Sequence, residues 1–360
     1  MFSLKNFDWL NFLVLILILS LGTVTVLSVN PQLFTTQITY VILGILVYLF
    51  LSSLDFRIFE GLGNFFYLMS ILILIAPLFW GIVSRGAVRW IQIGGITFQP
   101  SEFAKPLLII FFAKYWLSKN FNFKNLVAYF GYLFFPLFLI FRQPDLGSTL
   151  VVLVIALGIM FFTEINWKQI IVLALFFLLA VPFSVQFLKD YQKQRIVHFL
   201  NPWADPLGAG YNVIQSVISI GSGGLTGKGF GKGTQSHLAF LPERHTDFIF
   251  ASFAEEFGFL GSVGLILLYF LLLRRILQRS LALKDIFNLR ISLGVFFLIF
   301  FQVLVNIGMN LGVLPITGIT LPLFSYGGSS LVSTMICLGL TESVFRLTEE
   351  KSRLEIGVFR

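Results

Sequence analysis

The chain has 360 residues, of which 57% are hydrophobic and 12% are charged, and its mean hydropathy is +0.90. Soluble domains carry about 25% charged residues, and 44 phenylalanines are more than one soluble core can bury without large exposed apolar patches. This composition excludes a soluble globular enzyme and a disordered chain, and it favours a protein embedded in lipid. The single cysteine, Cys337, excludes a disulfide framework and a cysteine-based metal cluster.

Apolar runs along the chain predict an all-α polytopic integral membrane protein. A membrane helix needs roughly 20 mostly apolar residues, and the chain offers about ten such segments in succession. We expect these spans at residues 9–29, 35–53, 65–83, 101–118, 125–141, 147–164, 169–188, 248–273, 290–311 and 328–346. Together they predict a single membrane domain over the whole chain. The first run is too long for a cleavable signal peptide, and no small-x-small cleavage site follows it.

The net charge of +8 is explained by the positive-inside rule, under which Lys and Arg gather in cytoplasmic loops. Ten spans put both termini on one side of the membrane, and basic residues predominate in the short segments of that side. We therefore expect both termini in the cytoplasm. Nucleic-acid binding is not expected, because no basic-aromatic module or zinc-ligand spacing accompanies the charge.

Residues 189–247, between the seventh and eighth spans, form a long loop that we expect outside the cytoplasm. Loops longer than about 15 residues are usually functional or disordered, and this one holds all three histidines and many glycines. Its apolar run 213–220 predicts a short amphipathic helix. The glycines lack the spacing of a P-loop, so they serve either as flexible chain or as backbone that contacts an anion. A linker between two helical bundles is the alternative for the whole loop.

The stretch 241–250, directly before the eighth span, concentrates ionisable groups. Glu243, Arg244, His245 and Asp247 fall within five residues. A carboxylate at the mouth of a helical bundle, beside Arg and His, is suited to general-base catalysis. One alternative is a salt-bridge cluster that anchors the helix at the interface. A metal site is the other, although two ligands are too few for one.

Ionisable residues within membrane spans are rare and are often functional. Glu102 and Lys105 lie three residues apart, so they share one helix face and can simply neutralise each other. Residues 255–256, both glutamates, lie in the eighth span. Two polar segments rich in Gly and Pro, 85–102 and 306–330, are also unusual. Non-helical backbone at membrane depth is tolerated only where it is buried in protein or lines a wet cavity, so these segments predict an outward-facing cavity.

At these residues the sequence resembles the SEDS family (shape, elongation, division and sporulation proteins), which includes RodA, FtsW and SpoVE. The matching motifs, in chain order, are Arg89-Trp-Ile, Phe98-Gln-Pro-Ser-Glu-Phe-Ala-Lys105, Gln143-Pro-Asp-Leu-Gly-Ser148, Asp205-Pro-Leu-Gly-Ala-Gly-Tyr211, the stretch 241–250 and the segment 314–330. Each motif is weak alone, but the ordered set is specific and spans most of the chain. The sequence at residues 233–247 is closer to that of RodA than to that of FtsW.

The resemblance implies a peptidoglycan glycosyltransferase that polymerises lipid II at the outer face of the bacterial cytoplasmic membrane, for cell-wall elongation and cell shape. In that reaction a 4-hydroxyl attacks the anomeric carbon of a second disaccharide and expels undecaprenyl diphosphate with inversion. The essential aspartate of the family matches Asp247, which is the expected base. The family also implies two kinds of protein partner, namely a class B penicillin-binding protein with transpeptidase activity and other membrane proteins of an elongation complex.

The remaining candidate residues are expected around the cavity. Its substrate-binding walls are predicted to include Arg89, Trp90, Glu102, Lys105, Ser325 and Ser329, and its outer entrance Arg195, Glu243, Arg244 and His245. Arg89 or Lys105 is expected to reach phosphate. No protein metal site is expected, and Mg²⁺ or Mn²⁺ is the only cofactor considered. Two other functions are alternatives to the glycosyltransferase. A lipid II flippase would need comparable polar features on both faces, and a non-catalytic scaffold would not require Asp247 beside Arg and His.

Overall fold

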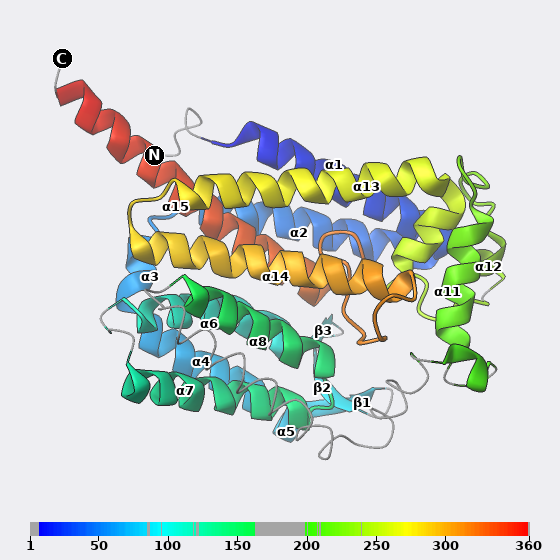
Figure 1. The fold of residues 1–360 in the computed structure, drawn as a ribbon, viewed down its shortest axis with the longest axis horizontal. Coiled ribbons are helices and arrows are strands. Elements are labelled where there is room, and N and C mark those ends of the chain that lie inside the picture. Colours follow the sequence, from blue (N-terminus) through cyan, green and yellow to red (C-terminus); the bar gives the residue numbers. More distant parts are fainter. Residues whose placement is uncertain are drawn as a thin grey trace.

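The computed structural model describes residues 7–84, 87–94, 96–117, 119, 122–162, 199, 201–206, 208, 210–238 and 240–358. Most of these residues are helical, and the long helices lie side by side as a bundle (Figure 1). The first part contains α1 (Trp9–Val29), η2 (Pro31–Leu33), α2 (Phe34–Ser53), α3 (Arg57–Gly61), α4 (Gly63–Ile75), α5 (Pro77–Trp80), α6 (Pro100–Tyr115), α7 (Phe123–Arg142) and α8 (Leu146–Phe161). The second contains η3 (Pro202–Ala204), α11 (Tyr211–Ser222), α12 (Thr234–His237), α13 (Ile249–Leu281), α14 (Ile286–Asn310) and α15 (Gly328–Val358).

Seven helical segments in the described part of the chain are long and apolar enough to cross a membrane. They coincide with predicted spans, and the two shorter helices α6 and α8 lie where two more were predicted. The predicted span 169–188 lies outside the described residues. Large apolar side chains such as Leu46, Phe50 and Phe134 are mostly exposed on the helices, as expected for surfaces that face lipid. The protein is therefore a multi-pass membrane protein, and the exact span count and sidedness stay predictions.

A small sheet interrupts the helical fold, and the expectation of an all-α chain did not include it. Strands β1 (Gly81–Ser84), β2 (Ala87–Ile93) and β3 (Ile96–Phe98) pair antiparallel in the order β1-β2-β3. The span predicted at 65–83 consequently ends at Trp80. Pro77 has no N–H to donate and interrupts the helix, and from Gly81 the chain pairs with β2 instead.

Helix α13 is broken near its start, where a continuous span was predicted. Gly258 has φ 66° and ψ −164°, which is not a helical conformation. The long loop pairs with the helix at this break, because the N–H groups of Phe259 and Leu260 donate to the carbonyls of Gly224 and Leu225. The predicted helix within the loop is confirmed as α11, which packs against α13 and α14.

Helix α14 lies at the centre of the bundle and contacts α6, α8, α13 and α15. In chain order α6, α8, α13 and α15 all begin at the end of the bundle where α14 finishes. The connection from α14 to α15, residues 311–327, also lies there (Figure 1). This arrangement brings residues from five distant parts of the sequence to one end of the protein.

Candidate active site

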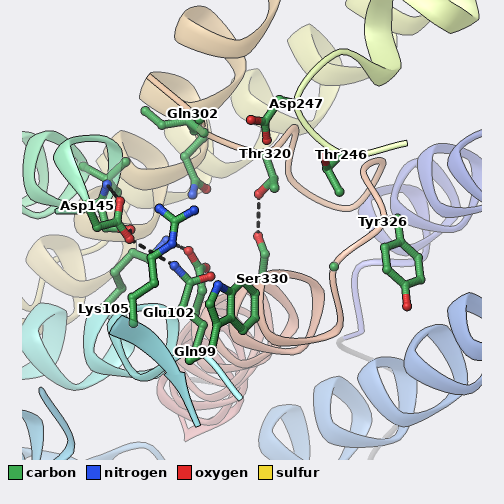
Figure 2. A pocket seen from close by; sticks show the side chains of 17 residues that line it. Gln99, Glu102, Lys105, Asp145, Thr246, Asp247, Gln302, Thr320, Tyr326 and Ser330 are labelled. Carbon is green, nitrogen blue, oxygen red and sulfur yellow. Dashed lines mark hydrogen bonds and ion pairs between the residues drawn. The ribbon is translucent and has the colours of Figure 1, made fainter. Parts of the chain in front are cut away.

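A polar pocket lies at this end of the bundle (Figure 2), with about 100 Å³ of space for water-sized molecules. Its walls come from β2, the first turns of α6 and α8, the turn before α13, the middle of α14 and the segment 318–330. The charged and amide side chains that line it are Arg89, Gln99, Glu102, Lys105, Asp145, Asp247 and Gln302. The predicted cavity therefore exists, and Trp90 lines it as well.

Asp247 stands in the turn before α13, and two asparagines hold its backbone. Its carbonyl oxygen accepts hydrogen bonds from Nδ2 of Asn306 and Nδ2 of Asn310, each 3.0 Å away. Both asparagines are fully buried in the last turns of α14. The carboxylate lies beside Gly318, where an added Cβ would be 3.6 Å from Oδ2 and where φ is +72°. Fixed backbone thus presents a half-buried carboxylate to the pocket.

The predicted ion pair within α6 is confirmed. Nζ of Lys105 lies 2.6 Å from Oε1 of Glu102, and the two side chains are only 1% and 8% exposed. The hydroxyl of Ser333 on α15 donates to the carbonyl oxygen of Glu102. A buried charge is costly unless it is paired, and here each group is the other's partner. The pair adds a strong local dipole to the wall of the pocket, but no net charge.

Asp145, which belongs to the motif at residues 143–148, is a second pocket carboxylate that was not predicted as a site residue. Its Oδ1 accepts from the backbone N–H of Ser148 and caps α8, and its Oδ2 accepts from Nε2 of Gln99 at 3.0 Å. Aspartate before an apolar helix is typical of an ordinary N-cap, which is why sequence alone did not distinguish it. In the structure Asp145 both caps α8 and lines the pocket.

Two polar groups in the pocket have atoms without a hydrogen-bond partner among the described residues. Oε1 of Gln302 is one, in a side chain that is 2% exposed, and Nε of Arg89 is the other. Figure 2 shows the Gln302 side chain reaching into the pocket. Buried polar atoms are rarely left unpaired in native proteins, so these atoms mark a place where a ligand or water completes the bonding. A glutamine inside an apolar span was the available sequence signal for Gln302.

A second pocket of about 250 Å³ adjoins the first. The residues common to both are Arg89, Trp90, Thr246, Tyr326 and Gly327. His245, which was predicted at the entrance, lines the second pocket, and its carbonyl oxygen accepts from the N–H of Tyr326. Burial, with Tyr40 nearby, raises the pKa of the Tyr326 hydroxyl, so this side chain is a neutral hydrogen-bonding group at physiological pH.

Arg244 and Glu243, predicted at the entrance, are not among the residues that line these two pockets. Nε of Arg244 points to the carbonyl of Val29 at the end of α1. Glu243 has a left-handed backbone with φ 51°, and its carbonyl accepts from the N–H groups of Thr246 and Phe248. This tight turn directs Asp247 into the pocket and the two preceding charged residues away from it.

Ser325 and Ser329, predicted in the wall, also lie behind the lining residues. The hydroxyl of Ser325 donates to the carbonyl of Thr246 at 2.7 Å, and that of Ser329 accepts from the N–H of Gln99. They position the backbone of the wall, while Tyr326, Gly327 and Ser330 form its surface. Arg195 lies outside the described residues. The catalytic and binding roles assigned to all of these residues stay predictions.

The glycine-rich segment 221–233 packs on α13. The N–H groups of Lys228 and Gly229 donate to the carbonyls of Glu255 and Glu256, each at 3.0 Å. Gly227 has φ +83°, and an added Cβ would lie 2.1 Å from the carbonyl oxygen of Glu256. Glycine is required here by close approach to the protein's own helix. This packing differs from both predicted roles, flexible chain and anion contact.

The two glutamates of α13 hold the same segment through their side chains. Oε1 of Glu255 lies 2.7 Å from Nζ of Lys228. Oε1 of Glu256 accepts from the hydroxyl of Ser28 on α1 and lies 3.1 Å from Nε2 of His237. Both carboxylates are buried, and neither lines the two pockets described above. These intramembrane charges therefore anchor the long loop to the bundle.

Within the part of the chain that the structure describes, no three His, Cys, Asp or Glu side chains are grouped as a metal site needs. A role for Mg²⁺ or Mn²⁺ is tested below with the substrate present.

Fold and site together define a class of protein. It is a polytopic helical membrane protein with a polar pocket at one end of the bundle, where a half-buried aspartate lies near Arg89 and the Glu102–Lys105 pair. Residues 3–350 match the FtsW/RodA/SpoVE family of cell cycle proteins, and the chain belongs to that family. The resemblance inferred from the motifs is thereby confirmed.

Individual relatives agree. The chain is 39% identical over 339 residues to the peptidoglycan glycosyltransferase MrdB of Escherichia coli K12, covering 92% of this chain and 91% of that protein. It is 34% identical to stage V sporulation protein E of Bacillus subtilis strain 168, covering 86% of each. Among solved structures it resembles a chain of a peptidoglycan synthase complex that coordinates polymerization and crosslinking, with TM-score 0.84, 35% identity and coverage of 96% and 99%. The rod shape determining protein RodA of Thermus thermophilus gives TM-score 0.74, 33% identity and coverage of 96% and 98%.

Proposed function

We propose that this protein is a peptidoglycan glycosyltransferase that polymerises lipid II into glycan strands for cell-wall elongation and cell shape. Family membership and the 39% identity to a peptidoglycan glycosyltransferase over nearly the whole chain support this activity. The observation that carries the mechanism is the Asp247 carboxylate, which lines one pocket with Arg89 and Lys105. That pocket combines a proton acceptor with cations, as the transfer of a sugar from a diphosphate requires.

Asp247 acts as the general base in this proposal. A sugar hydroxyl is a poor nucleophile until its proton is removed, and a positioned carboxylate removes it in the transition state. The 4-hydroxyl oxygen of the acceptor forms the new bond to the anomeric carbon of the donor. The bond from that carbon to the diphosphate breaks, and the leaving group departs with the electron pair while Asp247 takes the proton. Attack from the face opposite the leaving group inverts the linkage.

Cations next to the leaving group stabilise the charge that develops on the diphosphate. Arg89 is suited to this role because it lines both pockets and the buried Nε is unpaired among the described residues. Guanidinium groups bind phosphate oxygens through two parallel hydrogen bonds. Lys105 is already neutralised by Glu102 at 2.6 Å, so it acts mainly through the dipole of the pair. The two adjoining pockets offer separate places for donor and acceptor.

The proposal also includes the membrane in which the protein lies and the partner with which it works. Apolar helices support insertion in a membrane, and we place the protein in the bacterial cytoplasmic (inner) membrane with the pocket outward. The similarity to a chain of a peptidoglycan synthase complex supports a partner that cross-links the product. A class B penicillin-binding protein with transpeptidase activity is the kind of partner proposed.

Reconstituted protein tests the proposal with fluorescent lipid II. Asp247→Asn keeps the size of the side chain but removes the base, and we expect it to abolish glycan chains while the protein stays monodisperse. The matched control is Asp55→Asn, which makes the same change at an exposed carboxylate paired with Arg57, and it is expected to keep full activity. Glycan strands made by Asp247→Asn at the wild-type rate would refute the base assignment.

The same assay separates the other functions. Wild-type protein is tested with and without a cognate penicillin-binding protein, and with Mg²⁺, Mn²⁺ or chelator. Failure to polymerise in every combination, with transfer of labelled lipid II across vesicles, would identify a flippase. Failure in both assays would identify a scaffold.

A further inference from the structure

A third cavity lies at the other end of α13, far along the helix from Asp247. It has a volume of about 250 Å³ and opens between α1 and α13. We call it the α1–α13 cleft, and the lining residues that matter here are Leu10 and Asn11 of α1 and Leu271, Arg274, Arg275 and Gln278 of α13. None of them belongs to the candidate active site.

One side of the cleft continues into apolar surface along the two helices. Leu10, Leu13 and Leu17 are exposed on α1, and their spacing of three and four residues places them in one stripe. Leu267 and Leu271 form a similar stripe on α13. Both helices have the length and composition of membrane spans. The groove between the stripes is therefore suited to a lipid acyl chain.

The mouth of the cleft carries positive charge. Arg274 is exposed and makes no ion pair with any described residue, while Nε of Arg275 is held by Asp8 at 2.8 Å. Arg279 contacts Asp8 at 2.8 Å and Glu342 at 3.4 Å. Burial opposes the charge of Asp8, but the hydrogen bond from Arg275 helps to keep the pKa of that carboxyl below its usual range. Among the described residues here, three arginines stand against two carboxylates, so the mouth of the cleft is basic.

A buried acceptor in the cleft also lacks a donor. Asn11 is 6% exposed, and its Oδ1 has no hydrogen-bond partner in the described part of the chain. An unsatisfied buried carbonyl costs free energy that a ligand hydroxyl can recover. The cleft is therefore suited to one molecule that combines an anionic group, a hydroxyl donor and an apolar tail.

We propose that the α1–α13 cleft binds phosphatidylglycerol from the membrane. The phosphodiester lies at Arg274 and Arg275, a headgroup hydroxyl donates to Oδ1 of Asn11, and an acyl chain follows the leucine stripes. The basic mouth of the cleft favours an anionic headgroup over a zwitterionic one. Bound lipid would brace the start of α1 against α13 and, through the Asp8 and Glu342 contacts of Arg279, against α15.

The test uses the full chain in nanodiscs of equal phosphatidylethanolamine and phosphatidylglycerol, with native mass spectrometry of the lipids retained after mild delipidation. We expect phosphatidylglycerol to be enriched on the wild-type protein. Arg274→Gln is expected to lower that enrichment about fivefold, since a basic residue at a membrane surface contributes about this factor. The matched control, Arg57→Gln, removes the same charge from an exposed side chain on α3 and is expected to change nothing.

A second variant tests the hydroxyl contact. In nanodiscs of equal phosphatidylglycerol and phosphatidic acid, the wild-type protein is expected to retain more phosphatidylglycerol, because phosphatidic acid has the phosphate without the glycerol hydroxyls. Asn11→Leu is expected to remove that preference. If the lipids retained on the wild-type protein had the same composition as the nanodisc, that result alone would overturn the proposal. Equal losses in Arg274→Gln and Arg57→Gln would also overturn it, because they would indicate attraction to the whole surface.

Discussion

The buried pair of Glu102 and Lys105 supports a quantitative prediction for Lys105→Met. At 2.6 Å and an effective dielectric of about 20, the attraction between the two charges is roughly 6 kcal/mol. Removing Lys105 forfeits this attraction and leaves a carboxylate buried without its partner, which is costly. We therefore expect a net loss of about 3–5 kcal/mol in the free energy of unfolding.

Unfolding of purified protein in detergent measures this loss. Glu102→Gln with Lys105→Met removes both charges, and the double variant is expected to recover most of the stability. The matched control is Lys124→Met, which removes an exposed lysine from α7 and should alter stability by no more than about 0.5 kcal/mol. If Lys105→Met were as stable as the control, or the double variant as unstable as the single one, the pair would not be the cause. Lipid II polymerisation by the double variant then reports whether the charges also serve catalysis.

Two further predictions concern the loop and the cluster beside α1. Gly227→Ala is expected to destabilise the protein in thermal unfolding, because the left-handed φ of +83° costs about 1–2 kcal/mol and the added Cβ meets the Glu256 carbonyl at 2.1 Å. Gly221→Ala adds a methyl that meets nothing within 4 Å, and equal stability of the two variants would contradict the close approach. Asp8 has a lowered folded-state pKa, so its contribution to stability is present above about pH 4 and is lost as pH falls below that value. Acid titration of Asp8→Asn should lack this loss, and an unchanged acid profile would count against the ion pairs with Arg275.

Much of the fold followed from local composition. Lipid requires long apolar helices with internally satisfied backbone, so hydropathy located the predicted spans in the described part of the chain, although α13 and α15 continue beyond their predicted ends. The pairing of Glu102 with Lys105 followed from helical spacing alone. Asp247 was singled out because ionisable groups concentrate at residues 243–247, directly before an apolar span, and because it matches the essential aspartate of the family. Each of these features depends on neighbours within one or two helical turns.

Contacts between residues that are distant in the sequence could not be predicted from local pattern. Asp145 has the pattern of a helix cap, and its contact with Gln99 exists only because α6 and α8 begin side by side. The glycine-rich segment has the pattern of a flexible or ligand-binding loop, yet Gly227 packs on the carbonyl of Glu256. The sheet at residues 81–98 was missed because its pairing competes locally with the end of an apolar helix.

Sequence by itself thus determined that the protein is surrounded by lipid, that it is mainly helical, and which residue types are available for chemistry, because each of these depends on local pattern. Tertiary structure decided which of those residues share a pocket. Arg244 and Asp247 are three positions apart, but the left-handed turn at Glu243 sends one to α1 and the other to the pocket. Asn306, distant in sequence, holds the backbone of Asp247. Packing among helices sets these distances, and no pattern along a single helix contains them.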